Sequence, residues 1–369
     1  MSEKQSDLKR AFSEDGALKT HVGGQALIEG VMMRGKYNWA AAVREPAGTI
    51  YVEEHDLASG RSKNKWLYWP IVRGCRAFVE SLVLGYKALE VAALHAFSDS
   101  EPAREETGGP STDAAEQAVS TEEAAALSTV DFSGDDSDER ADDSFEFGKK
   151  EMALSMVLGL VLGVALFIIA PAVIANLLVG EYDSNTLAWN IVDGIVRVAI
   201  FVFYIWLIGR MEDIKRMFGY HGAEHKTIHC FEHGLDLTPE NARSFPRLHV
   251  RCGTAFLIMV MIIAILVYTV TPLNALIEAW GVPDGPIKLA LVIAVRILLM
   301  PLIAGISYEI TVKWAGSHPE NPLVKVILWP GMQMQRLTTR EPDDGQIECA
   351  IAAMKKVLER EDAEAAKVV

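Results

Sequence analysis

Cysteine is scarce in this sequence, and several common signals are missing. Its four cysteines are too widely spaced for a disulfide framework; they are Cys75, Cys230, Cys252 and Cys349. The glycine-containing block Gly23–Gly35 lacks the Gly-Lys-Ser/Thr ending of a phosphate-binding loop. The first 25 residues contain no apolar segment, so we expect no cleavable signal peptide. No cluster of Lys and Arg is large enough to bind a phosphate backbone, so we expect no nucleic-acid partner.

The sequence also has no excess of negative charge outside one segment. Its formal net charge is −14, and residues 98–147, with 16 acids and two bases, carry all of it. Within this segment, 107–143 is rich in Ser, Asp, Glu and Ala and has almost no large side chains. Such a composition buries too little apolar surface to offset the entropy of ordering. We therefore expect an acidic disordered tether at 99–147; the alternative is an acidic tail that binds a partner.

Long apolar runs are the strongest signal in the chain. Met152–Val179 contains no charged residue over 28 positions, whereas about 20 apolar residues suffice to cross a bilayer. Three further runs have the length of a span and little or no charge: Leu187–Ile208, Ala255–Leu276 and Leu289–Ile306. The alternative for such runs is a buried helix of a soluble protein. We expect a mainly α, polytopic helical membrane protein with about four spans and a small α+β cytosolic cap.

Basic residues favour one orientation of these spans. The connection 209–253 carries seven Lys and Arg residues, whereas 277–288 carries only Lys288. Basic loops stay on the cytoplasmic side, so both termini are predicted to be cytoplasmic. The predicted parts are a cytosolic region with a membrane-associated helix (1–98), the tether (99–147), a first pair of spans (148–209), a cytosolic His-rich loop (210–253), a second pair of spans (254–307) and a C-terminal cytosolic segment with its helix (308–369).

The two ends of the chain contain the expected cap. Trp39–Arg44 and Thr49–Glu53 flank a Pro-Ala-Gly turn and predict a β-hairpin. Ala77–Phe97 predicts a helix with one narrow polar stripe, which we expect to lie in the membrane interface; a fifth span is the alternative. Near the other end, Asp343 and Gln346 are spaced as in a capping box. The helix that they begin has an apolar stripe expected to pack on the N-terminal region: Ile347, Ile351, Met354 and Leu358.

Four histidines recur at intervals of four, and a fifth follows nearby. They are His221, His225, His229, His233 and His249. Helix positions four apart share a face, so His221 and His225 can reach one metal ion. Residues 221–225 read His-x-x-Glu-His, a pattern in which the glutamate serves as general base for metal-assisted hydrolysis. Four histidines climb about 18 Å along a helix, so one ion cannot bind all of them.

Two residues just before the third span are candidates to complete this site. Cys252 as a thiolate suits zinc, and His249 adds an imidazole. Zinc is the expected divalent transition metal, with iron as the alternative. The alternative without a metal is that these histidines form polar surface or contact lipid headgroups. The predicted set comprises the metal ligands His221, His225, His249 and Cys252, the catalytic base Glu224, and the supporting residues Glu232, Arg251 and Glu309.

Charged residues also fall within the second and fourth spans. Asp193 and Arg197 are four residues apart on one helix in the favourable order, and Arg296 is a candidate third member. An isolated charge at mid-bilayer costs about 2.5–3.5 kcal/mol on insertion scales, and pairing reduces that cost. We favour a structural ion pair; the alternative is a polar pathway or a pocket for an anionic ligand.

Five blocks of the sequence resemble one known family. They are Gly23–Gly35, Pro70–Gly74, Tyr220–Thr227, Leu248–Thr254 and Pro330–Gln346. In this order they are similar to motifs of the YqhQ-like family of bacterial membrane proteins, a domain of unknown function often labelled a predicted metal-dependent enzyme. The resemblance covers nearly the whole chain outside the acidic tether. It implies a multi-pass protein of the bacterial inner (cytoplasmic) membrane.

The resemblance supports some candidate residues and not others. It extends to His221, Glu224, His225, Glu232, His249 and Cys252. It does not extend to His229 or His233, and Val250 stands where a proline is common in relatives. In the first block, one interpretation is a packed turn, and the other is that Glu29 or Arg34 lines the site. The last block either binds an anion at a helix N-terminus or caps that helix.

The expected function is that of a metal-dependent, hydrolase-like enzyme whose site lies at the cytosolic face of the membrane. Its expected partners are the lipid bilayer and a lipid-linked or membrane-peptide substrate. Two alternatives belong to other classes. One is a non-enzymatic scaffold or assembly factor with a structural metal site. The other is a small transporter that uses the charges within the spans, and with only four spans it would need to form a homo-oligomer.

Overall fold

The computed structural model describes residues 10–11, 21–57, 65–96, 154–155, 157–180, 185–271, 277, 279–283, 285–315, 318 and 321–367. The chain forms two units, Ser100–Gly163 and the remainder, Met1–Asp99 with Val164–Val369. The predicted tether at 99–147 lies outside the described residues. The fold is mainly helical with a small antiparallel sheet, as the sequence predicts.

Four short strands near the N-terminus form the sheet in simple sequential order. They are β1 (Gly23–Leu27), β2 (Gly30–Arg34), β3 (Asn38–Arg44) and β4 (Ile50–Asp56). The predicted hairpin is the pair β3–β4, in which Arg44 lies opposite Ile50. Successive side chains of a strand point to opposite faces. In β3, Trp39, Ala41 and Val43 lie on one face, and Ala40 and Ala42 lie on the other.

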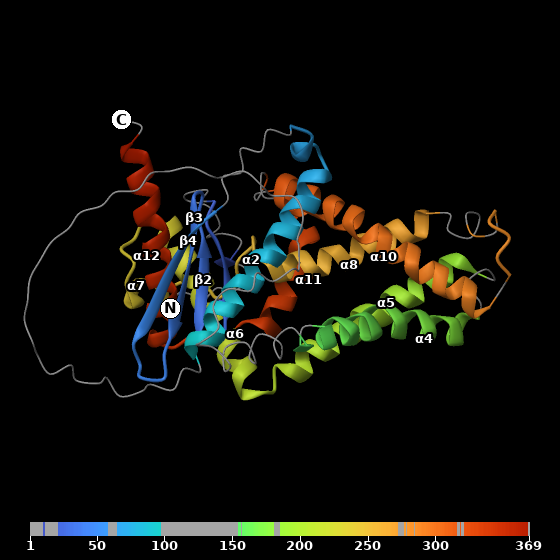
Figure 1. The fold of residues 1–369 in the computed structure, drawn as a ribbon, viewed down its shortest axis with the longest axis horizontal. Coiled ribbons are helices and arrows are strands. Elements are labelled where there is room, and N and C mark those ends of the chain that lie inside the picture. Colours follow the sequence, from blue (N-terminus) through green and yellow to red (C-terminus); the bar gives the residue numbers. More distant parts are fainter. Residues whose placement is uncertain are drawn as a thin grey trace, which may run out of the picture. The chain divides into compact units, whose positions relative to one another are not determined.

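Helices cover both faces of this sheet (Figure 1). Helix α2 (Val72–Ala96) packs on the face that carries Trp39, while α12 (Asp344–Ala366) and α6 (Glu212–Glu232) cover the other. The predicted capping box is confirmed, because the Asp343 side chain accepts from Gln346 N at 2.8 Å and Gln346 bonds back to Asp343 N. The apolar stripe of α12 packs on the N-terminal sheet, as expected.

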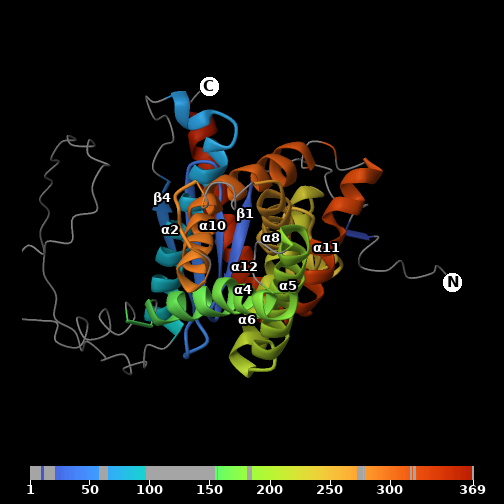
Figure 2. The same ribbon diagram turned by 90° about the vertical axis from the view of Figure 1, so that its right-hand side faces the viewer.

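Most of the remaining helices form a bundle beside this cap. They are η2 (Ala165–Ile169), α4 (Ala170–Val179), α5 (Thr186–Ile208), α8 (Gly253–Val270), α10 (Pro286–Tyr308), η3 (Glu309–Ala315) and α11 (Pro322–Thr338). Two short helices pack elsewhere: η1 (Lys65–Tyr68) contacts α2, and α7 (Pro239–Arg243) contacts α6 and α12. Helix α8 contacts α5, α10 and α11, and α4 contacts α5. Figure 2 shows these helices beside one another.

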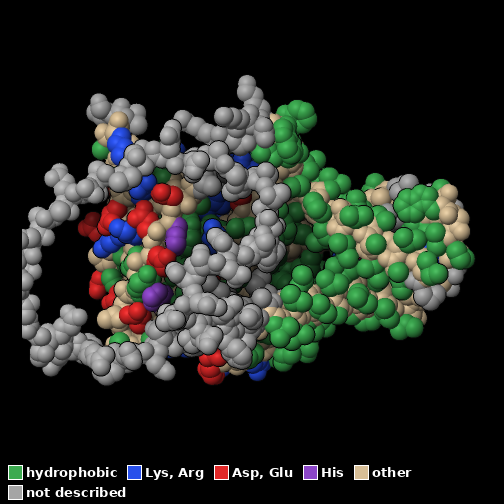
Figure 3. Space-filling model, in the orientation of Figure 1, with side chains coloured by type: hydrophobic (Ala, Val, Ile, Leu, Met, Phe, Trp, Pro, Cys, Tyr) green, Lys and Arg blue, Asp and Glu red, His purple; other side chains and the backbone are tan. Residues whose placement is uncertain are grey.

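Four helical stretches are long and apolar enough to cross a membrane. They are Val157–Val179, Leu187–Ile208, Gly253–Val270 and Ile287–Ala315, and they correspond to the four predicted runs. Only 11% to 33% of the most apolar window of each is buried, so most of these side chains face outward. In Figure 3 hydrophobic side chains gather over the bundle, and charged ones gather over the sheet. The chain is therefore compatible with a multi-pass membrane protein.

The fourth of these stretches is longer than the sequence predicts. Helix η3 continues α10 as far as Ala315, so Glu309 lies within the stretch and not at its end. The start of α2 crosses α10 here at close range, since a Cβ at Gly74 would lie 2.8 Å from Gly305 Cα. Helix α2 exposes Phe78 and Leu82 away from the sheet. Its location in the membrane interface stays a prediction.

Replacing Met354 by alanine should lower the stability of the cap. Met354 is fully buried between α12 and the sheet, so the change removes apolar contacts and leaves a cavity. We expect the free energy of unfolding to fall by about 2–5 kcal/mol. Thermal unfolding of the detergent-purified chain measures this loss. The exposed neighbour Lys355 gives the control variant Lys355→Ala, and equal melting temperatures for the two variants would contradict the packing of α12.

Candidate metal centre

Helix α6 carries the predicted site and is buried along most of its length. It begins with Glu212 and Asp213, whose charges suit a helix N-terminus. Every residue from Phe218 to Cys230 is buried, because the helix lies against β1, β2, α7 and α12. Its polar side chains must therefore bond to other protein groups.

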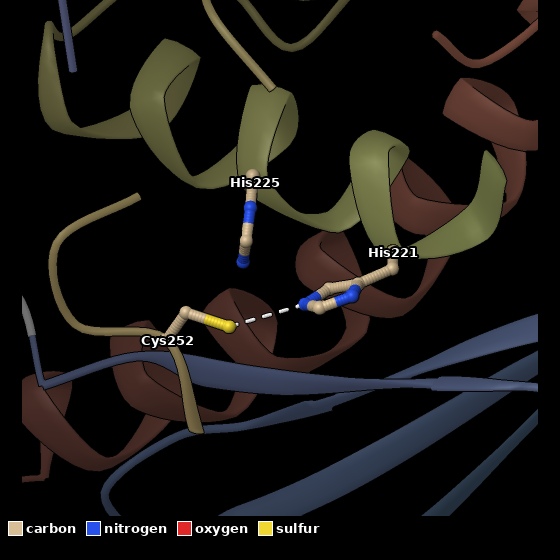
Figure 4. Close-up of side chains that lie close together, drawn as sticks. All are labelled: His221, His225 and Cys252. Atoms are coloured by element: carbon tan, nitrogen blue, oxygen red, sulfur yellow. Dashed lines mark hydrogen bonds between the residues drawn. The ribbon is translucent and has the colours of Figure 1, made fainter. Parts of the chain in front are cut away.

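Three potential metal ligands meet beside this helix: His221, His225 and Cys252. One donor atom from each lies within 4.8 Å of the others, and His221 Nε2 lies 3.1 Å from Cys252 Sγ. Figure 4 shows both imidazoles projecting from α6 toward the thiol, which belongs to the segment that leads into α8. The structure thus brings together three of the four predicted ligands.

Backbone carbonyls orient both imidazole rings. His221 Nδ1 donates to Thr338 O at 2.8 Å, and His225 Nδ1 donates to Arg247 O at 2.7 Å. With the proton on Nδ1, each neutral ring keeps its lone pair on Nε2. His225 Nε2 is buried and has no hydrogen-bond partner in the described part of the chain. Metal-binding histidines are typically held in this way.

The C-terminal sequence block holds the site from the other side of α6. Gly222 lets this block approach, because a Cβ there would lie 2.1 Å from Arg340 O. Gln335 holds the segment before Cys252: its Oε1 accepts from His249 N at 2.9 Å, and its Nε2 donates to His249 O at 2.8 Å. Segments on both sides of the spans α8 and α10 therefore fix the ligands.

Charges within the site favour the thiolate form of Cys252. Burial raises the pKa of Cys252, but the charges of His221 and His225 outweigh it and hold this pKa well below its usual value. Burial lowers the pKa of His221, and the charge of Cys252 reverses this effect and raises that pKa to about 9. The thiolate is the form of cysteine that binds metals.

Glu224 lies between α6 and β1. Its side chain is 5% exposed, and Gly24 makes room for it, since a Cβ at Gly24 would lie 2.7 Å from Glu224 Cγ. Burial raises the pKa of Glu224, and the charges of His221 and His225 oppose this rise. A raised pKa next to a set of potential ligands is the property expected of a general base.

A second group of potential ligands lies further along α6: His229, Glu232 and His249. The structure therefore places His249 in this group, beside His229. His249 Nδ1 accepts from Arg251 N at 3.3 Å, which leaves the ring proton on Nε2, 3.5 Å from Glu232 Oε2. A protonated nitrogen donates a hydrogen bond and does not bind a metal. Arg251 also pairs with Glu232, so this group supports the segment that carries Cys252.

Other residues singled out in the sequence contact different parts of the protein. Glu309 pairs with Arg73 of α2, with Arg73 Nε 2.6 Å from Glu309 Oε1. Glu29 pairs with Arg216 of α6, with Nε 2.6 Å from Oε1. Arg34 pairs with Glu80 of α2. These ion pairs join the N-terminal block and the bundle to their neighbours.

Sequence reasoning missed the residues that orient the ligands. Thr338 and Arg247 act through backbone carbonyls, and Gln335 binds the backbone of another segment. Every residue type has a backbone carbonyl, so nothing in the sequence indicated the contacts of Thr338 and Arg247. Gln335 lies in the last of the five sequence blocks, so its segment was singled out but its contact with His249 was not.

Gly222→Ala should weaken the centre without changing any ligand. At an exposed helix position this change would stabilise the helix by roughly 0.5–1 kcal/mol, but here the new Cβ would meet Arg340 O and displace Thr338 O from His221. We expect zinc affinity to fall about tenfold or more, measured by competition with a chelating dye. Gly23→Ala, at a position with open space, is the control. Unchanged zinc affinity in Gly222→Ala would contradict the role of this contact.

Comparison with known proteins agrees with the sequence blocks. The family described as Protein of unknown function (DUF1385) matches residues 69–360. The chain is 30% identical over 347 residues to a Bacillus subtilis (strain 168) protein named Uncharacterized protein YqhQ, with 92% of each chain covered. No solved structure matches the chain. The resemblance expected from the sequence is thereby confirmed, and this chain belongs to the DUF1385 family of YqhQ-like proteins.

Proposed function

We propose that this protein is a multi-pass protein of the bacterial cytoplasmic membrane that binds a divalent metal ion at His221, His225 and Cys252. Zinc is the expected ion and iron the alternative, because imidazole and thiolate suit both. The observation that carries the proposal is His225 Nε2, which is buried without a hydrogen-bond partner in the described structure. Such an atom loses free energy on burial, and a metal ion would give it a partner.

A cysteine–histidine nucleophile would explain less of this geometry. It needs only His221 and Cys252, which lie 3.1 Å apart. It would leave His225 Nε2 without a role, although the bond from His225 Nδ1 to Arg247 O orients that ring. A metal ion uses all three side chains.

We propose further that the activity is metal-dependent hydrolysis with Glu224 as the base. Three protein ligands leave one position for water, as in catalytic zinc sites, whereas structural zinc sites have four protein ligands. A bound ion lowers the pKa of such a water. Glu224 is buried next to the ligands with a raised pKa, which suits it to accept the proton.

The border of the membrane is the proposed location of this reaction. Cys252 immediately precedes Gly253, the first residue of a candidate span. The basic residues of 209–253 favour the cytoplasmic side for this end of α8 and for both termini. A substrate held in the bilayer reaches such a site directly, so we propose a lipid-linked or membrane-peptide substrate.

Metal content tests the first part of the proposal. Full-length protein purified in detergent without chelators should contain near-stoichiometric zinc or iron by elemental mass spectrometry. The variants His221→Ala/His225→Ala and Cys252→Ser should lose it. The control is His233→Ala, because His233 follows the last residue of α6 and belongs to neither group of potential ligands; its Nδ1 bonds to His229 O. Wild-type protein without metal would overturn the proposal, and loss in the control would indicate misfolding.

Glu224→Gln tests the second part. The variant should keep its metal and lose hydrolysis by about 100-fold or more, since glutamine cannot accept the proton. Mass spectrometry would follow the products released from vesicles of bacterial lipid extract and from membrane peptides. Glu240→Gln, at an exposed acid of α7, is the control. Loss of metal together with activity would make Glu224 a structural carboxylate. Full activity in Glu224→Gln would overturn its assignment as the base.

A further inference from the structure

A charged cluster lies within the apolar bundle, away from the metal centre. Helix α5 leads into α6 at its C-terminal end, so Asp193 lies in the half of α5 that is remote from α6, and Arg197 lies at its middle. Arg296 of α10 joins them, as the sequence suggested. The exposed fractions of Asp193, Arg197 and Arg296 are 2%, 7% and 1%. All three residues belong to stretches long and apolar enough to span a membrane.

Arg296 and Asp193 form a well-contacted neutral pair. Arg296 Nη1 donates to Asp193 Oδ2 at 2.7 Å, and Arg296 Nη2 donates to Asn190 Oδ1. The guanidinium lies 4.7 Å from the ring centroid of Trp189 and 4.6 Å from that of Tyr268. Aromatic faces at this distance stabilise a desolvated cation. The carboxylate of Asp193 therefore neutralises the charge of Arg296, which is one of the two arginines in the cluster.

Arg197 is the second cation on the same carboxylate. Its Nη2 donates to Asp193 Oδ2 at 2.9 Å, the oxygen that Arg296 already contacts. Its Nε is buried and has no hydrogen-bond partner among the described residues. In the described parts of the four stretches the only other acid is Glu309, which pairs with Arg73. Two guanidinium groups and one carboxylate leave the cluster with a charge of +1.

A buried excess charge of this kind needs an anion. A cation removed from water is stabilised most by a close opposite charge. Arg197 shares the carboxylate of Asp193 with Arg296, and its guanidinium otherwise lies 5.8 Å from the ring centroid of Tyr268. Guanidinium groups bind phosphate oxygens through two parallel hydrogen bonds. We propose that Arg197 is a binding site for a singly charged phosphate group, either the headgroup phosphodiester of a membrane lipid or inorganic phosphate. This site is independent of the metal centre.

The proposal and a purely structural ion pair predict opposite effects for Arg197→Gln. If Arg197 only tied α5 to its neighbours, the variant would lose stability. If Arg197 is the excess cation, the variant keeps the neutral Asp193–Arg296 pair. The protein without ligand then melts no lower than the wild type and no longer binds the phosphate group.

The test uses the full chain in non-ionic detergent after removal of lipid. Short-chain phosphatidylglycerol and inorganic phosphate are titrated separately, and short-chain diacylglycerol, which lacks phosphate, is the blank. Native mass spectrometry counts bound molecules, and the melting temperature reports stabilisation. We expect one phosphatidylglycerol or one phosphate per wild-type chain. The probe that binds more tightly shows whether the natural ligand is a lipid headgroup or inorganic phosphate. Arg197→Gln should bind that probe about tenfold more weakly or worse.

Two further variants sharpen this test. Arg210→Gln is the matched control, because Arg210 is an exposed arginine over Trp206 at the other end of α5, and it should bind like the wild type. Asp193→Asn raises the charge of the cluster to +2 and should bind the probe more tightly. Three results would overturn the proposal: no binding of either probe to the wild type, unchanged affinity in Arg197→Gln, or a lower melting temperature of that variant without ligand.

Discussion

The buried polar side chains of helix α6 are the constraint on which the surrounding structure depends. The helix is buried on nearly every side, although seven of its buried side chains are polar or charged. These side chains are His221, Glu224, His225, Lys226, Thr227, His229 and Glu232. A buried polar group needs a partner, or it costs free energy. Distant segments supply several of these partners. Lys226 Nζ, for example, donates to Phe245 O at 2.6 Å and pairs with Glu341. The sequence blocks before and after the spans therefore meet around one helix.

The two histidine groups show how a shared spacing leads to different chemistry. His221 and His225 each donate from Nδ1 to a carbonyl, so both direct Nε2 toward Cys252. His249 accepts at Nδ1 and keeps its proton on Nε2, beside Glu232. The first arrangement suits a metal ion, and the second is held by the ion pair of Arg251 with Glu232. The position of the neighbouring backbone groups makes this difference.

Helix α8 links the two sites that we propose. Cys252 precedes its first residue, and Tyr268, which contacts Arg296 and bonds to it through Oη, lies near its last. At 1.5 Å per residue these positions are about 24 Å apart along the helix. The metal centre and the cationic cluster thus lie at opposite ends of one apolar helix. Most apolar side chains of the four stretches face outward, which is compatible with a membrane around this bundle.

The sequence by itself determined the features that depend on neighbouring residues. Apolar length located the four stretches, a three-residue spacing located the cap of α12, and a four-residue spacing placed His221 and His225 on one face. Only the tertiary structure decided that His249 joins His229, that both arginines share one carboxylate oxygen of Asp193, and that Glu309 pairs with Arg73. The physical reason is distance along the chain. His221 is oriented by a carbonyl 117 residues away, and Asp193 is bound by an arginine 103 residues away. Contacts between such distant segments arise from packing and leave no period in the sequence.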